Sequence, residues 1–169
     1  MPAFDPLTRQ IQDLPVFLAG DANNYHLVLH EAADDGHAAG NNAALFPHVQ
    51  PFARRAPLSV VFSDPQIMLA GQSFKALTAS GIDFATGSVN FQNQGRSRVE
   101  LRNRGLLHVY GERGSGRFLG AEMVGPAAEH LGHLLAWAAQ QQQTVAQMLA
   151  CPFYHPVIEE GLRTALRQL

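Results

Sequence analysis

The sequence has few charged residues and almost no cysteine. Asp, Glu, Lys and Arg make up 15% of its 169 residues, against roughly 25% in an average globular chain. Cys151 is the only cysteine, which excludes an internal disulfide, a Cys-x-x-Cys pair and a cysteine zinc cluster. The net charge is −2, whereas a nucleic-acid-binding protein would show a basic patch and a high isoelectric point. We therefore expect no nucleic-acid partner.

Long apolar runs are also missing. No stretch approaches the roughly 18 apolar residues that a membrane span needs. The opening residues, Met-Pro-Ala-Phe-Asp, have neither the basic nor the apolar region of a secretory signal. Apolar residues still make up 46% of the chain, which is enough for a core. These features predict a soluble, cytoplasmic protein with no membrane partner.

The chain divides near residue 50. Residues 14–21 form a short apolar run that ends at Gly20 and Asp21, and such runs are typical of buried, parallel strands. Small and apolar residues then recur at helical spacing, which predicts a helix over residues 27–43. The residues of its apolar face are Leu29, Ala32, Ala33, Gly36, Gly40 and Ala43. Because one strand and one helix cannot bury both faces of a parallel sheet, residues 1–50 are interpreted as the remnant of a larger α/β domain.

The sequence predicts a second domain, of the α+β class, at residues 51–169, after a proline-rich linker. Strands are predicted at residues 58–62, 83–91, 98–101, 106–110 and 118–124, and the last three should form an antiparallel meander. Helices are predicted at residues 126–138, at 144–150 with Thr144 as N-cap, and at 158–169. The expected fold is an antiparallel sheet with helices packed on it.

Two short motifs contain residues that suit chemistry. Gly20 and Asp21 lie between the predicted strand and helix, where a carboxylate can accept hydrogen bonds from sugar or ribitol hydroxyls near a helix N-terminus. The alternative is an ordinary turn Asp that caps the helix. His155 comes just before the last helix and Glu160 lies in its first turn, so the two can form a pair suited to acid/base chemistry. The alternative is a surface His beside ordinary helix-terminal charges.

Two further groups are interpreted as structural. His130 and His133 share a helix face with Trp137, but two good ligands without a third make a poor metal site. We therefore expect a polar stripe beside a packed Trp and no metal. Cys151 has no resolving cysteine, so we expect a small packed residue rather than a redox centre.

Four segments, in order, resemble the pyridine nucleotide–disulfide oxidoreductases. Val16-Phe-Leu-Ala-Gly-Asp21 and the Leu29-His-Glu-Ala-Ala-Asp-Asp-Gly36 after it are similar to that family's second flavin-binding motif. Residues 59–67 resemble the opening of its dimerisation domain, and residues 117–125 resemble a glycine-containing strand of that domain. His155-Pro156, with Glu160 five residues after the His, is similar to its catalytic His-Pro-x-x-x-Glu. Within the family, the chain most resembles dihydrolipoamide dehydrogenase, with a glutathione reductase-type enzyme as the alternative.

The resemblance implies a mechanism for the intact parent enzyme. Electrons would pass among NAD, FAD, a cysteine pair and a dithiol substrate such as dihydrolipoamide. His155 would take a proton from the substrate thiol, because the thiolate is the nucleophile in exchange, and Glu160 would orient and charge-stabilise the imidazolium. In that family this His serves the active site of the other subunit, which implies a homodimer.

The same resemblance implies a set of flavin contacts. Asp21, after Gly20, would bind the flavin ribitol, and backbone N–H groups near Leu29 and His30 would face the flavin ring. Residues 1–50 would then be the end of the FAD-binding domain, and residues 51–169 the dimerisation domain.

The departures from the family pattern concern whole elements. The Gly-x-Gly-x-x-Gly of the flavin pyrophosphate site, the Cys-x-x-x-x-Cys pair and the nicotinamide-binding domain are all missing from this sequence, and Val157 stands where the family usually has Thr. We therefore expect the chain by itself to be inactive and to bind no cofactor. The competing interpretation is a stand-alone, non-enzymatic dimerisation module.

Overall fold

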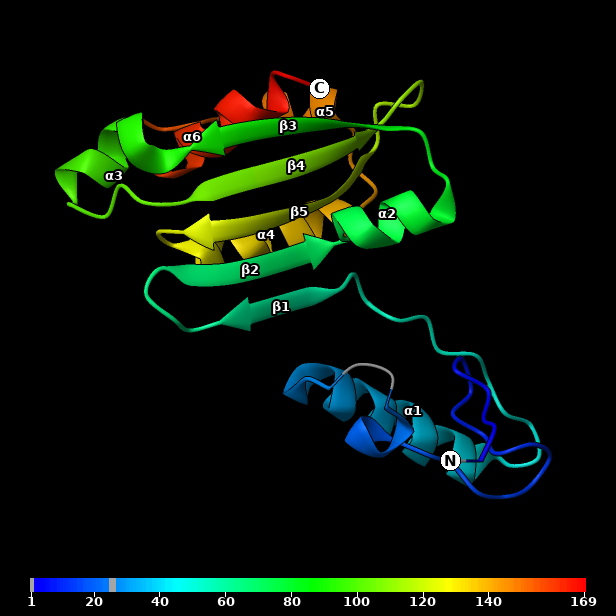
Figure 1. The fold of residues 1–169 in the computed structure, drawn as a ribbon. Coiled ribbons are helices and arrows are strands. Elements are labelled where there is room, and N and C mark those ends of the chain that lie inside the picture. The colour runs from blue at the N-terminus through cyan, green and yellow to red at the C-terminus, as the bar shows by residue number, and fades with distance from the viewer. Residues whose placement is uncertain (1, 25–26) are drawn as a thin grey trace. The chain divides into compact units, whose positions relative to one another are not determined.

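A five-stranded antiparallel sheet organises the larger part of the chain (Figure 1). The computed structural model describes residues 2–24 and 27–169, and it divides into one compact unit that ends at Arg55 and a second, Ala56–Leu169. The sheet lies in the second unit, with strand order β1-β2-β5-β4-β3. Its strands are β1 (Leu58–Val61), β2 (Gln66–Gly71), β3 (Phe84–Asn90), β4 (Leu106–Glu112) and β5 (Phe118–Gly125). The predicted α+β class is confirmed.

Three helices cover one face of this sheet: α4 (Ala128–Gln140), α5 (Val145–Leu149) and α6 (Glu159–Leu166) (Figure 1). The main core lies between them and the sheet, where Met68, Ala121 and Leu135 are buried. Thr144 is the N-cap of α5, as predicted, and it forms a capping box with Gln147. The three predicted helices are confirmed, and the core forms because their apolar stripes face the apolar side of the strands.

The sequence pattern failed at three elements of this unit. The strand β2 and the helix α2 (Phe74–Ser80) were not predicted. The strand predicted at residues 98–101 is wrong, because residues there belong to the helix α3 (Gly95–Val99) and its end. The side chain of Gln94 accepts a hydrogen bond from the Ser97 N–H at 2.7 Å and so starts that helix. The predicted meander is therefore also wrong in part: β4 and β5 pair, but the other neighbour of β4 is β3.

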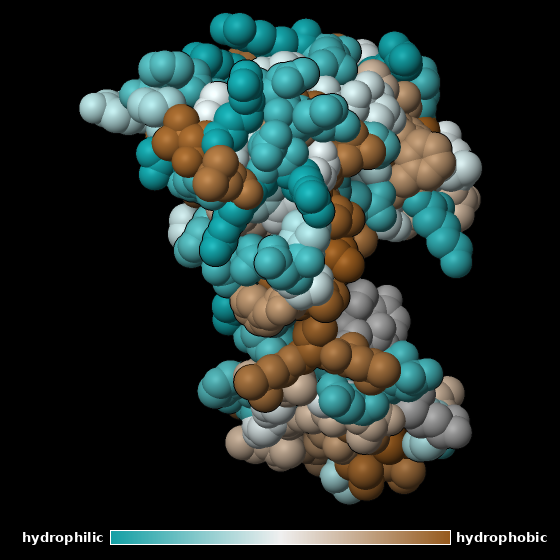
Figure 2. Space-filling view, turned by 60° about the vertical axis from the view of Figure 1, so that its left-hand side comes forward, coloured by the Kyte–Doolittle hydropathy of each residue, from teal (hydrophilic) through white to brown (hydrophobic). Residues whose placement is uncertain are grey.

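The helix α3 ends in a Schellman motif with a leucine in the left-handed position. The Arg102 N–H bonds the Ser97 carbonyl at 2.9 Å and the Leu101 N–H bonds the Arg98 carbonyl at 3.1 Å, which is the pattern that usually takes glycine. Leu101 has φ 57° and is 89% exposed. Figure 2 shows the surface coloured by hydropathy, with hydrophobic residues in brown.

Leu101→Gly is therefore expected to stabilise the protein by about 1 kcal/mol, because glycine removes the strain of a left-handed leucine and little buried surface is lost. Urea unfolding measures the difference. Val99→Gly, in the helix and 70% exposed, is the matched control and should lower stability by about 0.5–1 kcal/mol. A Leu101→Gly variant less stable than the wild type would contradict this interpretation.

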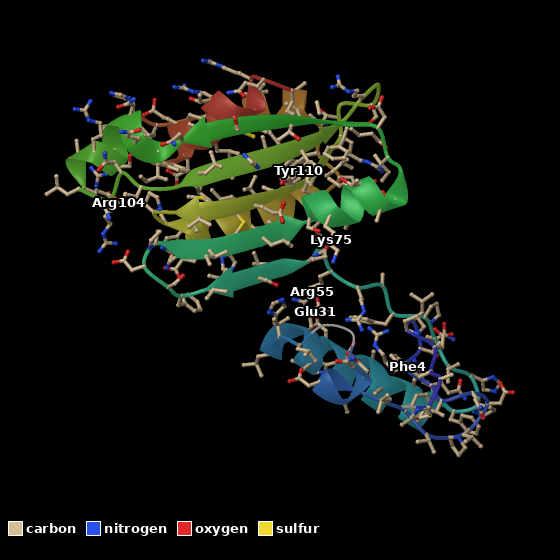
Figure 3. All side chains as sticks on the ribbon, in the orientation of Figure 1. Phe4, Glu31, Arg55, Lys75, Arg104 and Tyr110 are labelled. Atoms are coloured by element: carbon tan, nitrogen blue, oxygen red, sulfur yellow. The ribbon has the colours of Figure 1, made fainter. Side chains whose placement is uncertain are left out.

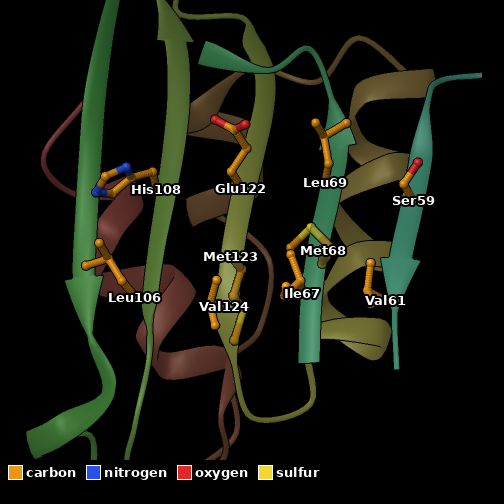
Figure 4. Close-up of a pocket in the computed structure, with 10 residues that line it drawn as sticks. All are labelled: Ser59, Val61, Ile67, Met68, Leu69, Leu106, His108, Glu122, Met123 and Val124. Carbon is orange, nitrogen blue, oxygen red and sulfur yellow. The ribbon is translucent and has the colours of Figure 1, made fainter. Parts of the chain in front are cut away.

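The other face of the sheet is largely uncovered. A hollow of about 390 Å³ on this face is lined by side chains of β1, β2, β4 and β5. Figure 4 labels its lining residues, among them Val61, Leu106, His108 and Glu122. At one end, Phe74 of α2 packs on Phe84 and Tyr110, with ring centroids 5.6 and 6.1 Å away. Burial and the hydrogen bond to Glu122 raise the pKa of Tyr110, a residue that is labelled in Figure 3. This face therefore combines exposed aliphatic side chains with a few polar ones.

In the unit that ends at Arg55, the strand predicted at residues 14–21 is wrong. The structure has only an isolated bridge between Gln10 and Phe17 there, followed by the short helix η1 (Gly20–Asn23). Val16 is 48% exposed. An apolar run forms a buried strand only beside other strands, and no strand lies in the described part of this unit.

The helix α1 (Leu29–Leu45) exists as predicted, but its predicted buried face is wrong. Leu29 is 87% exposed, and most of the other small residues of that face are exposed too. The buried side instead comprises Glu31, Asp34, Asp35, Ala38, Ala39 and Asn42. Arginines from the flanking segments pair with its carboxylates: Arg54 with Glu31 at 2.6 Å and Arg9 with Asp35 at 2.7 Å (Glu31 is labelled in Figure 3). Buried charges need such partners, and helical periodicity alone does not show them.

None of the helices in the described residues is long and apolar enough to span a membrane.

Candidate active site

His155 and Glu160 meet at the start of α6. His155 Nδ1 lies 2.9 Å from Glu160 Oε2, and the same oxygen is 3.4 Å from the Val157 N–H. The loop makes this contact because His155 precedes the helix and Glu160 occupies its first turn. The His155–Pro156 peptide bond is cis.

The pair is asymmetric in its exposure to solvent. The Glu160 side chain is 17% exposed and that of His155 is 79% exposed. Nε2 of His155 makes no hydrogen bond to any residue in 2–24 or 27–169. A carboxylate can only accept, so Nδ1 carries a proton and neutral imidazole presents the Nε2 lone pair to solvent. This arrangement suits a group that takes up and returns protons at Nε2.

The surroundings keep Glu160 ionised. Partial burial alone would raise the pKa of Glu160, but the hydrogen bonds from His155 and Val157 and the charges of His155 and Arg163 outweigh it, so the pKa is lowered from its ordinary value of 4.5. A group with a depressed folded-state pKa contributes stability above its unfolded-state pKa, and that contribution is lost as the pH falls through the folded-state value.

Glu160→Gln is thus expected to flatten the acid limb of the stability curve. Between neutral pH and the region below 4.5, the wild type should lose more unfolding free energy than the variant, because only the wild type must protonate this paired carboxylate. Urea titrations at several pH values measure this difference. Glu159→Gln removes the neighbouring helix-terminal charge and serves as the control. Its stability should fall with decreasing pH as steeply as that of the wild type. Parallel curves for wild type and Glu160→Gln would contradict the pairing.

Two residues that the sequence did not single out support the pair. Arg163 Nη2 donates to Glu160 Oε1 at 2.8 Å. Gln94 Nε2 donates to the Val157 carbonyl at 2.7 Å and so fixes the loop after His155. The contact of Arg163 with Glu160 could have been predicted from the sequence, since Arg163 lies three residues after Glu160 on a helix and such pairs are neighbours. Gln94 had none, because the contact joins residues 63 positions apart.

The four predicted flavin-contact residues lie in the unit that ends at Arg55. Gly20 has φ 67°, and a Cβ built on it would lie 3.3 Å from Cβ of Ala32, so Gly20 packs against the first turns of α1. Leu29 and His30 are the first two residues of that helix. Asp21 is exposed, and no described residue donates a hydrogen bond to its carboxylate. An acceptor of this kind near a helix N-terminus fits the hydroxyl-bearing chain of a flavin.

The remaining candidate residues do not form a site. His133 Nδ1 is 2.7 Å from the Glu129 carbonyl of its own helix, and the ring packs edge-on to Trp137 with centroids 6.3 Å apart. Trp137 is 63% exposed, so the prediction of a packed Trp is wrong. Among the residues that the structure describes, no three His, Cys, Asp or Glu side chains are grouped to hold a metal ion. The predicted packing of Cys151 is wrong, since it is exposed.

Comparison with known proteins shows the family. Residues 58–166 match the dimerisation domain of the pyridine nucleotide-disulphide oxidoreductases. The chain therefore belongs to this family, and the resemblance found in the sequence is confirmed. The matched range begins at β1 and extends to the last residue of α6, so it contains both His155 and Glu160.

Relatives in two groups of enzymes align with most of the chain. It is 29% identical to a mercuric reductase of Acidithiobacillus ferrooxidans and 29% identical to a dihydrolipoyl dehydrogenase of Halobacterium salinarum, in each case over 89% of this chain but only 27% and 31% of the relative. The chain thus spans about a quarter to a third of the length of the curated relatives it matches.

Solved structures show the same fold. LpdA from Mycobacterium tuberculosis aligns with a TM-score of 0.81 at 22% identity, over 97% of this chain and 35% of its own. The HOCl-induced flavoprotein disulfide reductase RclA from Escherichia coli aligns with a TM-score of 0.76 at 18% identity, over 90% of this chain and 35% of its own.

Proposed function

We propose that the chain supplies the dimerisation region and the acid/base pair of a flavin-dependent oxidoreductase of the dihydrolipoamide dehydrogenase type. The observation that carries this proposal is the 2.9 Å contact between His155 Nδ1 and Glu160 Oε2, with Nε2 directed to solvent rather than to a described residue. His155 takes the proton of a substrate thiol at Nε2 and returns it later, and Glu160 stabilises the imidazolium that forms.

The partner in this reaction is a second subunit of the parent enzyme. The His155 side chain is exposed, and the chain contains no cysteine pair for it to serve. An exchange site for His155 must therefore come from another segment or subunit. The unit Ala56–Leu169 also exposes apolar side chains that a twofold interface would cover, including Val61 on the sheet and Trp137 on α4.

A dithiol is the substrate that this pair fits. Thiol–disulfide exchange needs a thiolate, so a proton acceptor is required. A mercuric ion instead needs soft thiolate ligands, and Cys151 is the only thiol that this chain can contribute. The relatives named dihydrolipoyl dehydrogenase therefore agree with the site better than those named mercuric reductase.

In the parent enzyme, residues 1–50 would belong to the FAD-binding domain, with FAD and NAD as cofactors. FAD, when bound, supplies the electron relay between the dithiol and NAD. Asp21, following Gly20, would accept hydrogen bonds from the ribitol, while the N–H groups of Leu29 and His30 would face the ring system. The chain by itself is a dimerisation module without that relay.

A chimaera tests the assignment of the acid/base pair. The full chain replaces the segment that it matches in the Halobacterium salinarum dihydrolipoyl dehydrogenase, and turnover of dihydrolipoamide with NAD⁺ is measured. His155→Gln should lower turnover by about 10²–10⁴-fold, the usual contribution of a general acid/base, while the flavin spectrum stays unchanged. His133→Gln is the control and should have no effect. Equal turnover in the His155→Gln chimaera would refute the proposal.

A further inference from the structure

The carboxylate of Glu160 is held by both of its oxygens. Oε2 meets His155 Nδ1 at 2.9 Å, and Oε1 accepts a hydrogen bond from Arg163 Nη2 at 2.8 Å. Arg163 lies on α6, almost one turn after Glu160. The imidazole and the guanidinium thus bind opposite oxygens of one carboxylate, and each fixes the orientation that the other needs.

Arg163 also contacts the loop before the His. Its guanidinium carbon lies 5.5 Å from the ring centroid of Phe153, within the range of a cation–π contact. Phe153 precedes His155 by two residues. The planar guanidinium can stack on a ring and donate to a carboxylate at the same time, which an ammonium group cannot do equally well. Arg163 therefore joins the loop that bears His155 to the helix that bears Glu160.

Little else restrains the Glu160 carboxylate. The His155 side chain is 79% exposed, and the terminal torsion of a Glu side chain has a broad, poorly defined minimum. The other contact to the carboxylate from the described residues is the Val157 N–H at 3.4 Å, which is long for a hydrogen bond. Without Arg163, rotation of the carboxylate would leave Nδ1 without a fixed acceptor.

We propose that Arg163 is a positioning residue, which holds Oε1 of Glu160 so that Oε2 fixes the Nδ1–H tautomer of His155 and leaves Nε2 as the proton acceptor. This inference rests on the proposed function, because a fixed tautomer matters only where His155 transfers protons. A purely structural Arg163 would contribute to stability and leave the tautomer unchanged, so the tautomer separates the two roles.

The experiment is long-range ¹H–¹⁵N correlation NMR of the histidine rings in the ¹⁵N-labelled full chain, at a pH where the imidazole is neutral. In the wild type, His155 should be mainly Nδ1–H. Arg163→Gln should lower the ratio of Nδ1–H to Nε2–H about fivefold, equivalent to about 1 kcal/mol, the contribution of one hydrogen bond. Arg163→Lys keeps the positive charge but loses the planar guanidinium. Its ratio of Nδ1–H to Nε2–H should lie between those of the wild type and Arg163→Gln.

Arg167→Gln is the matched control, because Arg167 follows α6 and makes no ion pair with a described residue. It should leave the ratio unchanged. A wild-type ratio in both Arg163→Gln and Arg163→Lys, even with lowered thermal stability, would overturn the positioning role while the proposed function stands. A wild type with no preference for Nδ1–H would overturn both, since the His–Glu pair would then not form.

Discussion

The purified chain should elute from gel filtration colourless and should give no turnover with dihydrolipoamide and NAD⁺. The sequence has no Gly-x-Gly-x-x-Gly loop to bind the flavin pyrophosphate and no cysteine pair to pass electrons. The few polar groups near Asp21 and the start of α1 would contact only part of a flavin, so they should not retain it. The visible spectrum and a dihydrolipoamide assay measure both properties.

The intact Halobacterium salinarum dihydrolipoyl dehydrogenase, treated in the same way, serves as the positive control for this assay. FAD retained in a one-to-one ratio, or measurable turnover by the chain alone, would show that the chain contains a complete site. The interpretation of residues 1–50 as a remnant of a larger domain would then be wrong.

Gly87→Ala should produce one of the largest losses of stability of any conservative change in the sheet. Gly87 lies in β3 under α6, and a Cβ at this position would sit 2.1 Å from the Ala165 carbonyl oxygen and 3.0 Å from its carbon. Backbone atoms cannot move aside as a flexible side chain can, so α6 would have to shift and the core beneath it would open. We expect a loss of at least about 3 kcal/mol in the free energy of unfolding.

Urea unfolding of the variant measures this loss. Gly95→Ala is the matched control, because a Cβ there meets nothing within 4 Å, and it should stay within about 0.5 kcal/mol of the wild type. The displacement of α6 should also disturb the His155–Glu160 pair, since Glu160 lies on that helix. Equal midpoints for the two variants would mean that α6 does not pack on β3 as closely as described.

Sequence patterns predicted most of the elements that bury an apolar side against another element of the chain. These elements bury apolar stripes against one another, and their apolar residues recur at strand or helix spacing in the sequence. They are the strands β1, β3, β4 and β5 and the helices α4, α5 and α6. The strand β2 was not predicted, although Gln66–Gly71 lies between β1 and β5 in the sheet. Residues 98–101 were predicted as a strand because the helix there depends on hydrogen bonds of the Gln94 and Ser97 side chains. The periodicity of apolar residues gives no sign of such hydrogen bonds.

The unit before Ala56 was harder to predict for a different reason. The apolar run at residues 14–21 has the composition of a buried strand, yet no neighbouring strand is available in the described part of this unit. In α1 the buried side is acidic because Arg9 and Arg54 neutralise it, and both arginines are distant in sequence. The pairing of His155 with Glu160 was predictable because it is local, whereas the contact of Arg163 with Phe153 depends on the loop conformation.

Sedimentation equilibrium of the full chain tests the central claim most directly, that this chain is a dimerisation region. At micromolar concentration the account predicts a species of twice 18.4 kDa. Trp137→Glu and Val61→Glu each place a charge on an exposed apolar site of the unit Ala56–Leu169. The substitution that lies in the dimer interface should shift the protein from dimer toward monomer, and this identifies the surface that forms the dimer. A wild-type chain that remains a monomer across the micromolar range would contradict the account.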